Sequence, residues 1–152
     1  SGTVRGVYLA GGFALPIIQQ PEDKPAYVSN RTGLVTQFNA PSNYGVTGLL
    51  AHNYLAGEEF YKLRTGQEVA LIYGDSLIKR YQVARIDTFQ KLTPSRLKSD
   101  YLELSTGRRL STSQMFKRFY RGDEHLTFQT CLEKDGLLNW GLLLVTAVPV
   151  DS

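Results

Sequence analysis

The hydrophobic residues of this chain fall into short runs rich in β-branched and aromatic side chains, separated by Gly, Asn and Asp. Runs of this kind, broken by turn-forming residues, are typical of β-strands. The clearest predicted strands are VALIYG (69–74), YQVARIDTF (81–89), LTFQTC (126–131) and LLLVTAV (142–148). The Gly-Asp-Ser sequence between the first two strands predicts a hairpin turn.

Patterns that predict helices are few. Residues 57–64, GEEFYKLR, have acidic residues in a first turn and basic residues in a last turn, which favours a short helix. A second candidate helix covers residues 111–120, STSQMFKRFY, and residues 94–96 predict a loop or a single helical turn. Many short strands with few helices predict an all-β fold, a closed or nearly closed barrel with helical insertions.

Length and composition predict one globular domain over residues 1–152. The chain is 42% hydrophobic and 20% charged, enough for one core and too short for two comfortable domains. The longest strongly apolar run, residues 141–150, is about half the roughly 20 residues that a membrane-spanning helix needs. No segment therefore predicts a membrane span, and no secretory signal opens the sequence.

Charge and aromatic content argue against nucleic acid as the partner. The 17 Lys and Arg exceed the 14 Asp and Glu by three, but the basic residues are scattered rather than gathered in a block. Nine Tyr and seven Phe could line a groove for a single strand, but most of them alternate within predicted strands and are assigned to the core. A basic barrel that binds single-stranded nucleic acid stays open as a minor alternative.

Cys131 and His52 are the candidate catalytic pair. Cys131 is the single cysteine, which forbids an internal disulfide, and it ends a predicted strand. His52 follows the apolar segment 45–51, so both side chains are predicted to leave a strand at its edge. A thiol is a strong nucleophile as the thiolate, and a nearby imidazole can take its proton. The other histidine, His125, precedes the strand of Cys131, and six extended residues put it roughly 20 Å away, which makes it the poorer partner.

Composition and spacing alone leave a second interpretation of Cys131 open. A lone cysteine at a strand end is more often a packed core residue than a nucleophile, since free cysteine is among the most buried residue types. A histidine that begins a loop is usually a surface or capping residue. One Cys and two His at these separations do not have the spacing of a zinc site, so we expect no metal. Neither a Gly-rich phosphate loop nor a GxSxG elbow is present.

Three motifs match one known family in order and spacing. Residues 127–131, TFQTC, are similar to a T-L-x-T-C signature with Phe128 in place of Leu; residues 49–53, LLAHN, precede a helix-and-turn segment; and the Asn-Trp-Gly of 139–141 leads into an apolar strand. Together they resemble the sortases, cysteine transpeptidases of bacterial cell surfaces. The similarity runs from about Leu15 to Val148.

The resemblance implies a closed β-barrel of about eight strands with short helices in the connections. It also implies that the Cys131 thiolate attacks a peptide carbonyl of a sorting signal and that protonated His52 gives its proton to the leaving amine. An amine of a cell-wall precursor or a pilin lysine then resolves the thioester. No cofactor is implied. Residues expected to shape the oxyanion site or to bind substrate are Thr130, Asn53, Trp140 and Leu142.

Leu142 departs from the family pattern, in which the catalytic arginine follows the Trp-Gly pair. An apolar side chain cannot supply that guanidinium. Alternation along the strand puts Leu142 and Leu144 on one face, and the resemblance implies that Leu142 faces the groove near Cys131. Either another basic residue serves, with Arg118, Arg121 and Lys134 as candidates, or the protein binds a peptide or a surface partner without turning it over.

The resemblance further implies an extracytoplasmic protein of the cell surface. Such a protein is expected to be membrane-anchored in its full length, by an anchor outside this chain.

Overall fold

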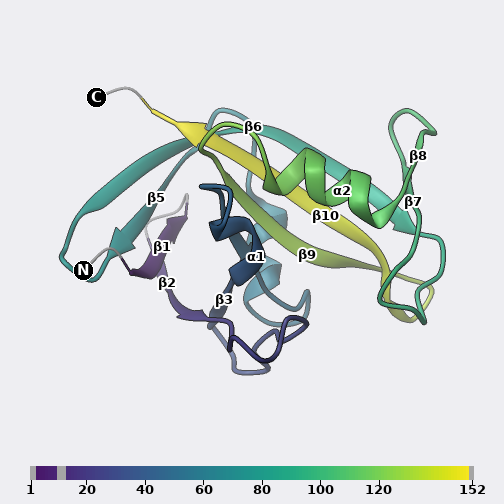
Figure 1. Cartoon of the computed structure of the whole chain (residues 1–152), viewed down its shortest axis with the longest axis horizontal. Coiled ribbons are helices and arrows are strands. Elements are labelled where there is room, and N and C mark those ends of the chain that lie inside the picture. The colour runs from purple at the N-terminus through teal and green to yellow at the C-terminus, as the bar shows by residue number, and fades with distance from the viewer. Residues whose placement is uncertain (1–2, 10–12, 151–152) are drawn as a thin grey trace.

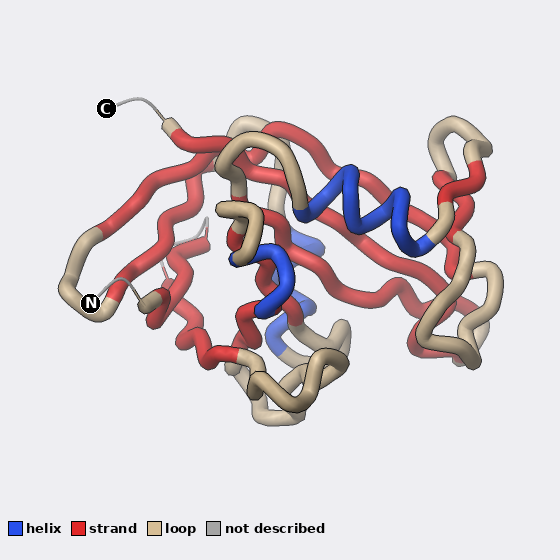
Figure 2. Tube along the Cα trace, viewed as in Figure 1, coloured by secondary structure: helices blue, strands red, loops and turns tan. Residues whose placement is uncertain are grey.

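The computed structural model, which describes residues 3–9 and 13–150, contains ten β-strands, and short helices lie in the connections (Figure 2). The strands are β1 (Val4–Leu9), β2 (Phe13–Gln19), β3 (Val35–Phe38), β4 (Thr47–Leu50), β5 (Glu68–Tyr73), β6 (Ile78–Lys91), β7 (Tyr101–Glu103), β8 (Arg109–Leu110), β9 (Leu126–Lys134) and β10 (Leu137–Pro149). The helices are α1 (Asn39–Ser42), the 3-10 helix η1 (Ala56–Lys62) and α2 (Thr112–Tyr120).

The sheet closes on itself because β10 pairs with β6 as well as with β9. The closed order is β10-β9-β4-β3-β2-β1-β5-β6, which confirms the predicted barrel of eight strands. β7 and β8 continue outward from β6 and are not part of the closure. In Figure 1, β6, β9 and β10 are the long strands, and α2 lies across them.

Alternating side chains of β10 supply two separate hydrophobic clusters. Leu143, Val145 and Ala147 pack in the barrel interior. Leu142 and Leu144 point the other way, into a second cluster between the outer face of the sheet and α2. This is the alternation that the sequence predicted, and it follows from the two-residue period of a strand whose two faces are both covered.

The hairpin between β9 and β10 corrects two predicted boundaries. Cys131 does not end its strand, because β9 continues to Lys134, and β10 begins at Leu137, well before the predicted 142. The turn consists of Asp135 and Gly136, both with positive φ (52° and 81°). Asp-Gly favours this tight hairpin turn, which lets both strands run to its edge.

The two predicted helices are present, and one differs in type. Residues 57–64 were expected to form a short helix, and the structure has the 3-10 helix η1 there. α2 is an α-helix whose N-cap, Ser111, accepts from the Gln114 N–H, while the Gln114 side chain accepts from the Ser111 N–H. This capping box satisfies two otherwise unpaired donors and fixes where α2 begins.

Phe128 should be a principal contributor to barrel stability. It is 0% exposed and its ring contacts that of Phe60 edge to face, with centroids 5.1 Å apart. We expect Phe128→Ala to lower the free energy of unfolding by about 3–5 kcal/mol, measured by denaturant titration. Leu97→Ala is the control, since Leu97 is 83% exposed and its loss should change stability by no more than about 0.5 kcal/mol. A Phe128→Ala loss below about 1 kcal/mol would contradict this view of the core.

Candidate functional site

The side chain of Cys131 lies on the outer face of the barrel, not in its interior. On β9, Phe128 and Thr130 are buried on the barrel side, so Gln129 and Cys131 point outward. Cys131 is partly buried against the cluster beneath α2. Cys131 is thus neither fully buried nor fully exposed, and both the packing and the nucleophile interpretations stay open.

An apolar cavity begins beside Cys131. Leu142 is the direct partner of Cys131 in the β9–β10 ladder and belongs to the cluster beneath α2. The cavity has a volume of about 230 Å³. Its walls include Leu142, Leu144, Gln129, Tyr101, Phe116 and Met115. The strand partner of Cys131, Leu142, thus lines a hydrophobic recess formed mainly by β9, β10, β7 and α2.

His52 reaches the level of Cys131 through the parallel pairing of β4 with β9. Leu50 lies opposite Gln129, and the Ala51 N–H donates to the Gln129 carbonyl at 3.2 Å. β4 ends at Leu50, and extending its alignment two residues further would bring the His52 backbone level with Cys131, one strand spacing away, about 4.8 Å between backbones. The His52 ring stacks on Tyr54, with centroids 5.3 Å apart and planes at 22°.

Gly57 allows η1 to begin directly against the His52 backbone. A Cβ on Gly57 would lie 2.5 Å from the His52 carbonyl oxygen and 2.3 Å from Thr130 Oγ1. The Gly57 N–H donates to that same carbonyl at 3.0 Å. Within the described residues, Thr130 Oγ1 has no hydrogen-bond partner, and it points to the barrel side, away from Cys131. A contribution of Thr130 at an oxyanion site would therefore come from its backbone, not from its hydroxyl.

Asn53 and Tyr61 tie the His52 loop to the β9–β10 hairpin. The Asn53 amide donates to the Leu138 carbonyl at 3.1 Å, and the Tyr61 hydroxyl donates to the Cys131 carbonyl. Burial raises the pKa of Tyr61, and the nearby Cys131 adds to this rise. Asn53 is itself buried, and it lines a cavity of about 380 Å³ together with Tyr61 and Leu132.

Two residues that the sequence did not indicate, Lys91 and Tyr101, act electrostatically on Cys131. Burial raises the pKa of the Cys131 thiol, and the positive charge of Lys91 opposes that rise. The pKa of Tyr101 is raised by its burial and then by the neighbouring Cys131. Lys91 and Tyr101 face each other across β6 and β7. Their proximity to Cys131 arises from strand register, which the sequence pattern does not reveal.

The Arg118 side chain forms ion pairs with carboxylates on β6 and β7. Its guanidinium pairs with Glu103 at 2.8 Å and with Asp87 at 3.4 Å, and it lies over the Phe89 ring at 5.6 Å from the centroid. This pairing lowers the pKa of Glu103. Glu103 is separated from Cys131 by three strand spacings, about 14 Å. The structure therefore does not bring Arg118 to Cys131.

The other two basic candidates are likewise held by aromatic rings. The Arg121 guanidinium lies 4.5 Å from the centre of the Tyr44 ring, before the start of β9 and thus at the end opposite Cys131. Lys134 Nζ lies 4.9 Å from the centre of the Trp140 ring, near the hairpin turn. Trp140 is partly buried in β10, one residue before Gly141.

His125 is buried at the far end of β9 from Cys131. Its ring nitrogens lie 2.8 Å from the Asp123 carbonyl oxygen and 2.7 Å from that of Phe119. It thus has a structural place beside α2, separate from the candidate pair.

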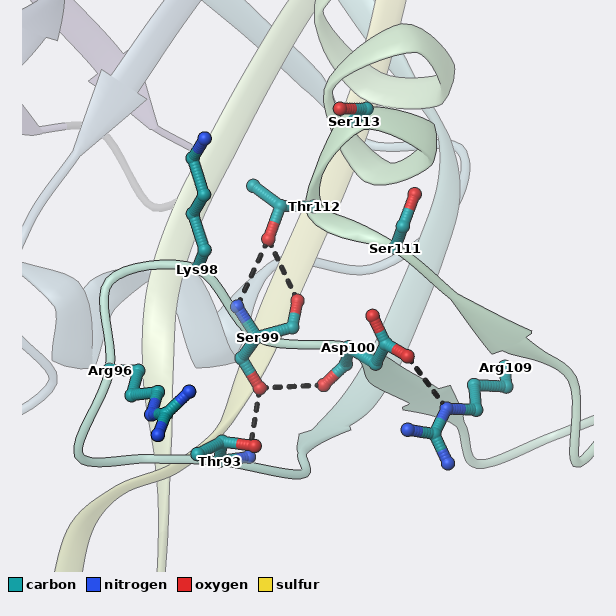
Figure 3. Close-up of a pocket in the computed structure, with 9 residues that line it drawn as sticks. All are labelled: Thr93, Arg96, Lys98, Ser99, Asp100, Arg109, Ser111, Thr112 and Ser113. Carbon is teal, nitrogen blue, oxygen red and sulfur yellow. Dashed lines mark hydrogen bonds and ion pairs between the residues drawn. The ribbon is translucent and has the colours of Figure 1, made fainter.

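A polar cavity of about 390 Å³ lies at the start of α2 (Figure 3). Its Thr112 and Ser99 hydroxyls bond to backbone groups: the Thr112 hydroxyl donates to the Ser99 carbonyl at 2.7 Å, and Ser99 Oγ accepts from the Thr93 N–H at 2.8 Å. Arg109 pairs with Asp100 at 2.8 Å. Cys131 and His52 are not among the residues that line this cavity.

Gly57→Ala should disturb both the fold and the site. The added methyl would meet the His52 backbone, which cannot move without shifting the loop. We expect a loss of about 1–3 kcal/mol in the free energy of unfolding, together with an altered rate of Cys131 alkylation. Gly6→Ala is the matched control, since a Cβ there would come no closer than 3.4 Å to its neighbours. Equal stability for Gly57→Ala and the wild type would show that η1 does not constrain His52.

Comparison with solved structures identifies the fold. Sortase C1 from Streptococcus suis has a TM-score of 0.64 and 16% identity over 99% of this chain and 75% of its own. Sortase A from Corynebacterium diphtheriae has a TM-score of 0.62 and 13% identity over 99% of this chain and 61% of its own. Sortase C1 from Streptococcus agalactiae has a TM-score of 0.58 and 18% identity over 97% of this chain and 67% of its own.

The chain thus spans between 61% and 75% of the length of these three structures. No protein-family model matches the sequence, and no curated protein is detectably similar to it. None of the helices in the described residues is both long enough and apolar enough to span a bilayer.

Proposed function

Because this chain has the sortase fold, we propose that it is a sortase-type cysteine transpeptidase with Cys131 as nucleophile and His52 as its acid–base partner. The observation that carries the proposal is the β4–β9 alignment, which brings His52 to the level of an outward-facing Cys131. A thiol and an imidazole on adjacent backbone positions are the minimum for thiolate chemistry.

The reaction follows from these two groups. The Cys131 thiolate attacks the carbonyl carbon of a sorting-signal peptide, the C–N bond breaks, and His52 gives a proton to the departing amine. The acyl group remains on sulfur as a thioester. An amine of a cell-wall precursor or a pilin lysine then attacks the thioester, a proton returns to His52, and the thiolate leaves. The product is a new amide, so no net oxidation or cofactor is involved.

The apolar cavity beside Leu142 is the natural place for a side chain of the peptide. Its walls come from β9, β10 and α2, so it is fixed by the same elements that position Cys131. Sorting at a cell surface implies an extracytoplasmic location and an anchor outside this chain.

The second candidate function is peptide binding without turnover. Leu142 stands where sortases have an arginine, and Arg118 is held by Glu103 and Asp87. Burial also raises the pKa of the Cys131 thiol, which disfavours the reactive thiolate. A protein with these features would still bind a peptide in the groove but would not catalyse its transfer.

Labelling separates the two functions. A sorting-signal peptide ending in a thiol-reactive group should add one equivalent of mass to the wild type, located at Cys131 by peptide mapping. Cys131→Ala should show no adduct. Saturable binding of the same peptide without any adduct would favour the binder.

Cys131→Ala and His52→Ala should abolish transfer while leaving the fold intact. Cys131 is only partly buried at the edge of its cluster, so its truncation should cost less than about 1 kcal/mol in the free energy of unfolding. Each variant should lower kcat/KM for peptide transfer by a hundredfold or more, about 3 kcal/mol of transition-state stabilisation. A Cys131→Ala loss of about 2 kcal/mol or more, with transfer retained, would mark a packing residue.

A further inference from the structure

Lys91 lies near Cys131 through two successive strand pairings. Cys131 is paired with Leu142 on β10, and Leu142 is paired with Phe89 on β6. Lys91 is two residues beyond Phe89, so it lies on the same outer face of the sheet. Two strand spacings and two residues of rise put the Cα atoms of Lys91 and Cys131 about 12 Å apart. An extended lysine side chain covers about 6 Å of that span.

The ammonium of Lys91 is not used by another group. Among residues 3–9 and 13–150, no carboxylate lies within ion-pair distance of it, and it has no ring contact of the kind that holds Lys134. Lys91 is partly buried, which keeps its charge less screened than that of a fully exposed lysine. Its strand partner is Tyr101, which lines the apolar cavity.

Other titratable groups surround Cys131 from each neighbouring element. Tyr101 faces it from β7, Tyr61 from η1 and His52 from the loop after β4. Glu133 is two residues along β9 and exposed. Of the charged side chains in the described part of the chain, Lys91 is the one whose field acts on the thiol against the effect of burial.

We propose that Lys91 is the cation that stabilises the negative charge formed at Cys131, supplied from β6 because Leu142 on β10 carries none. Before attack, this charge is the thiolate. During attack it is the oxyanion of the tetrahedral intermediate, and this second part rests on the proposed function. The ammonium keeps its proton throughout and forms no covalent bond, so its contribution is electrostatic.

The test is the pH dependence of Cys131 alkylation by iodoacetamide. The wild type, Lys91→Gln, Lys91→Arg and the control Lys98→Gln are compared, since Lys98 is an exposed lysine on the following loop. A cation beside a thiol favours the thiolate, so its removal should move the midpoint of the rate profile to higher pH. We expect a rise of about half a unit or more for Lys91→Gln and none for Lys91→Arg or Lys98→Gln.

Salt gives a second measurement that needs no variant. Raising the ionic strength should move the wild-type midpoint upward, toward that of Lys91→Gln, because the charge is only partly buried. An unchanged midpoint in folded Lys91→Gln, or a salt-independent wild-type profile, overturns the proposal. If Lys91→Gln does not fold, the salt series and Lys91→Arg still decide it.

Alkylation requires no peptide, so this result is independent of transfer. A shifted midpoint without any peptide adduct would leave Lys91 in its role and reject the transpeptidase. Peptide adducts without a shifted midpoint would support the transpeptidase and reject the role of Lys91. Where both hold, Lys91→Gln should lower kcat for peptide transfer tenfold or more with KM little changed, whereas Lys98→Gln should match the wild type.

Discussion

The site depends on the double pairing of β9, which lies parallel to β4 on one side and antiparallel to β10 on the other. The parallel pairing brings the end of β4, and with it His52, to the level of Cys131. The antiparallel pairing places Leu142 beside Cys131, and the closure of β10 onto β6 carries the alignment on to Phe89. A shift of one residue in either ladder would turn the Cys131 thiol into the barrel. The backbone hydrogen bonds that close the barrel therefore also set the direction in which this thiol points.

Local pattern predicted the strands and helices that have clear boundaries in the sequence. The strand around Cys131 was predicted too short because Asp135-Gly136, a strong tight-turn pair, was not used to extend the hairpin. α2 was predicted correctly because Ser111 and Gln114 provide a start that is visible locally.

The part of the site that the sequence did not predict is set by long-range register. Positions at predicted strand ends and the motif resemblance both indicated His52 and Cys131, whereas Lys91 lies two residues beyond the predicted strand 81–89 and has no local feature to distinguish it from other lysines. Its relation to Cys131 passes through Phe89 and Leu142, on strands far apart in the sequence. Pairings of this kind are decided by closure of the whole barrel and not by any one segment.

The location of Cys131 involves two opposing effects. Packing against the cluster beneath α2 restricts the position of the Cys131 sulfur, which is the kind of positioning that the proposed chemistry would use. The same burial raises the pKa of the thiol and so reduces the thiolate. Formation of the thiolate at such a buried cysteine requires a nearby positive charge that is not already paired with a carboxylate.

Arg118 cannot meet that requirement, although it too is partly buried. Glu103 is 4% exposed and depends on Arg118 for its counter-charge. Moving the guanidinium toward Cys131 would leave this carboxylate buried and unpaired, at a cost of about 3–5 kcal/mol. Lys91 has no ion-pair partner among residues 3–9 and 13–150, so within that part of the chain it would break no ion pair in the role proposed for it. The two cations therefore differ in cost: Arg118 would have to give up its ion pairs with Glu103 and Asp87.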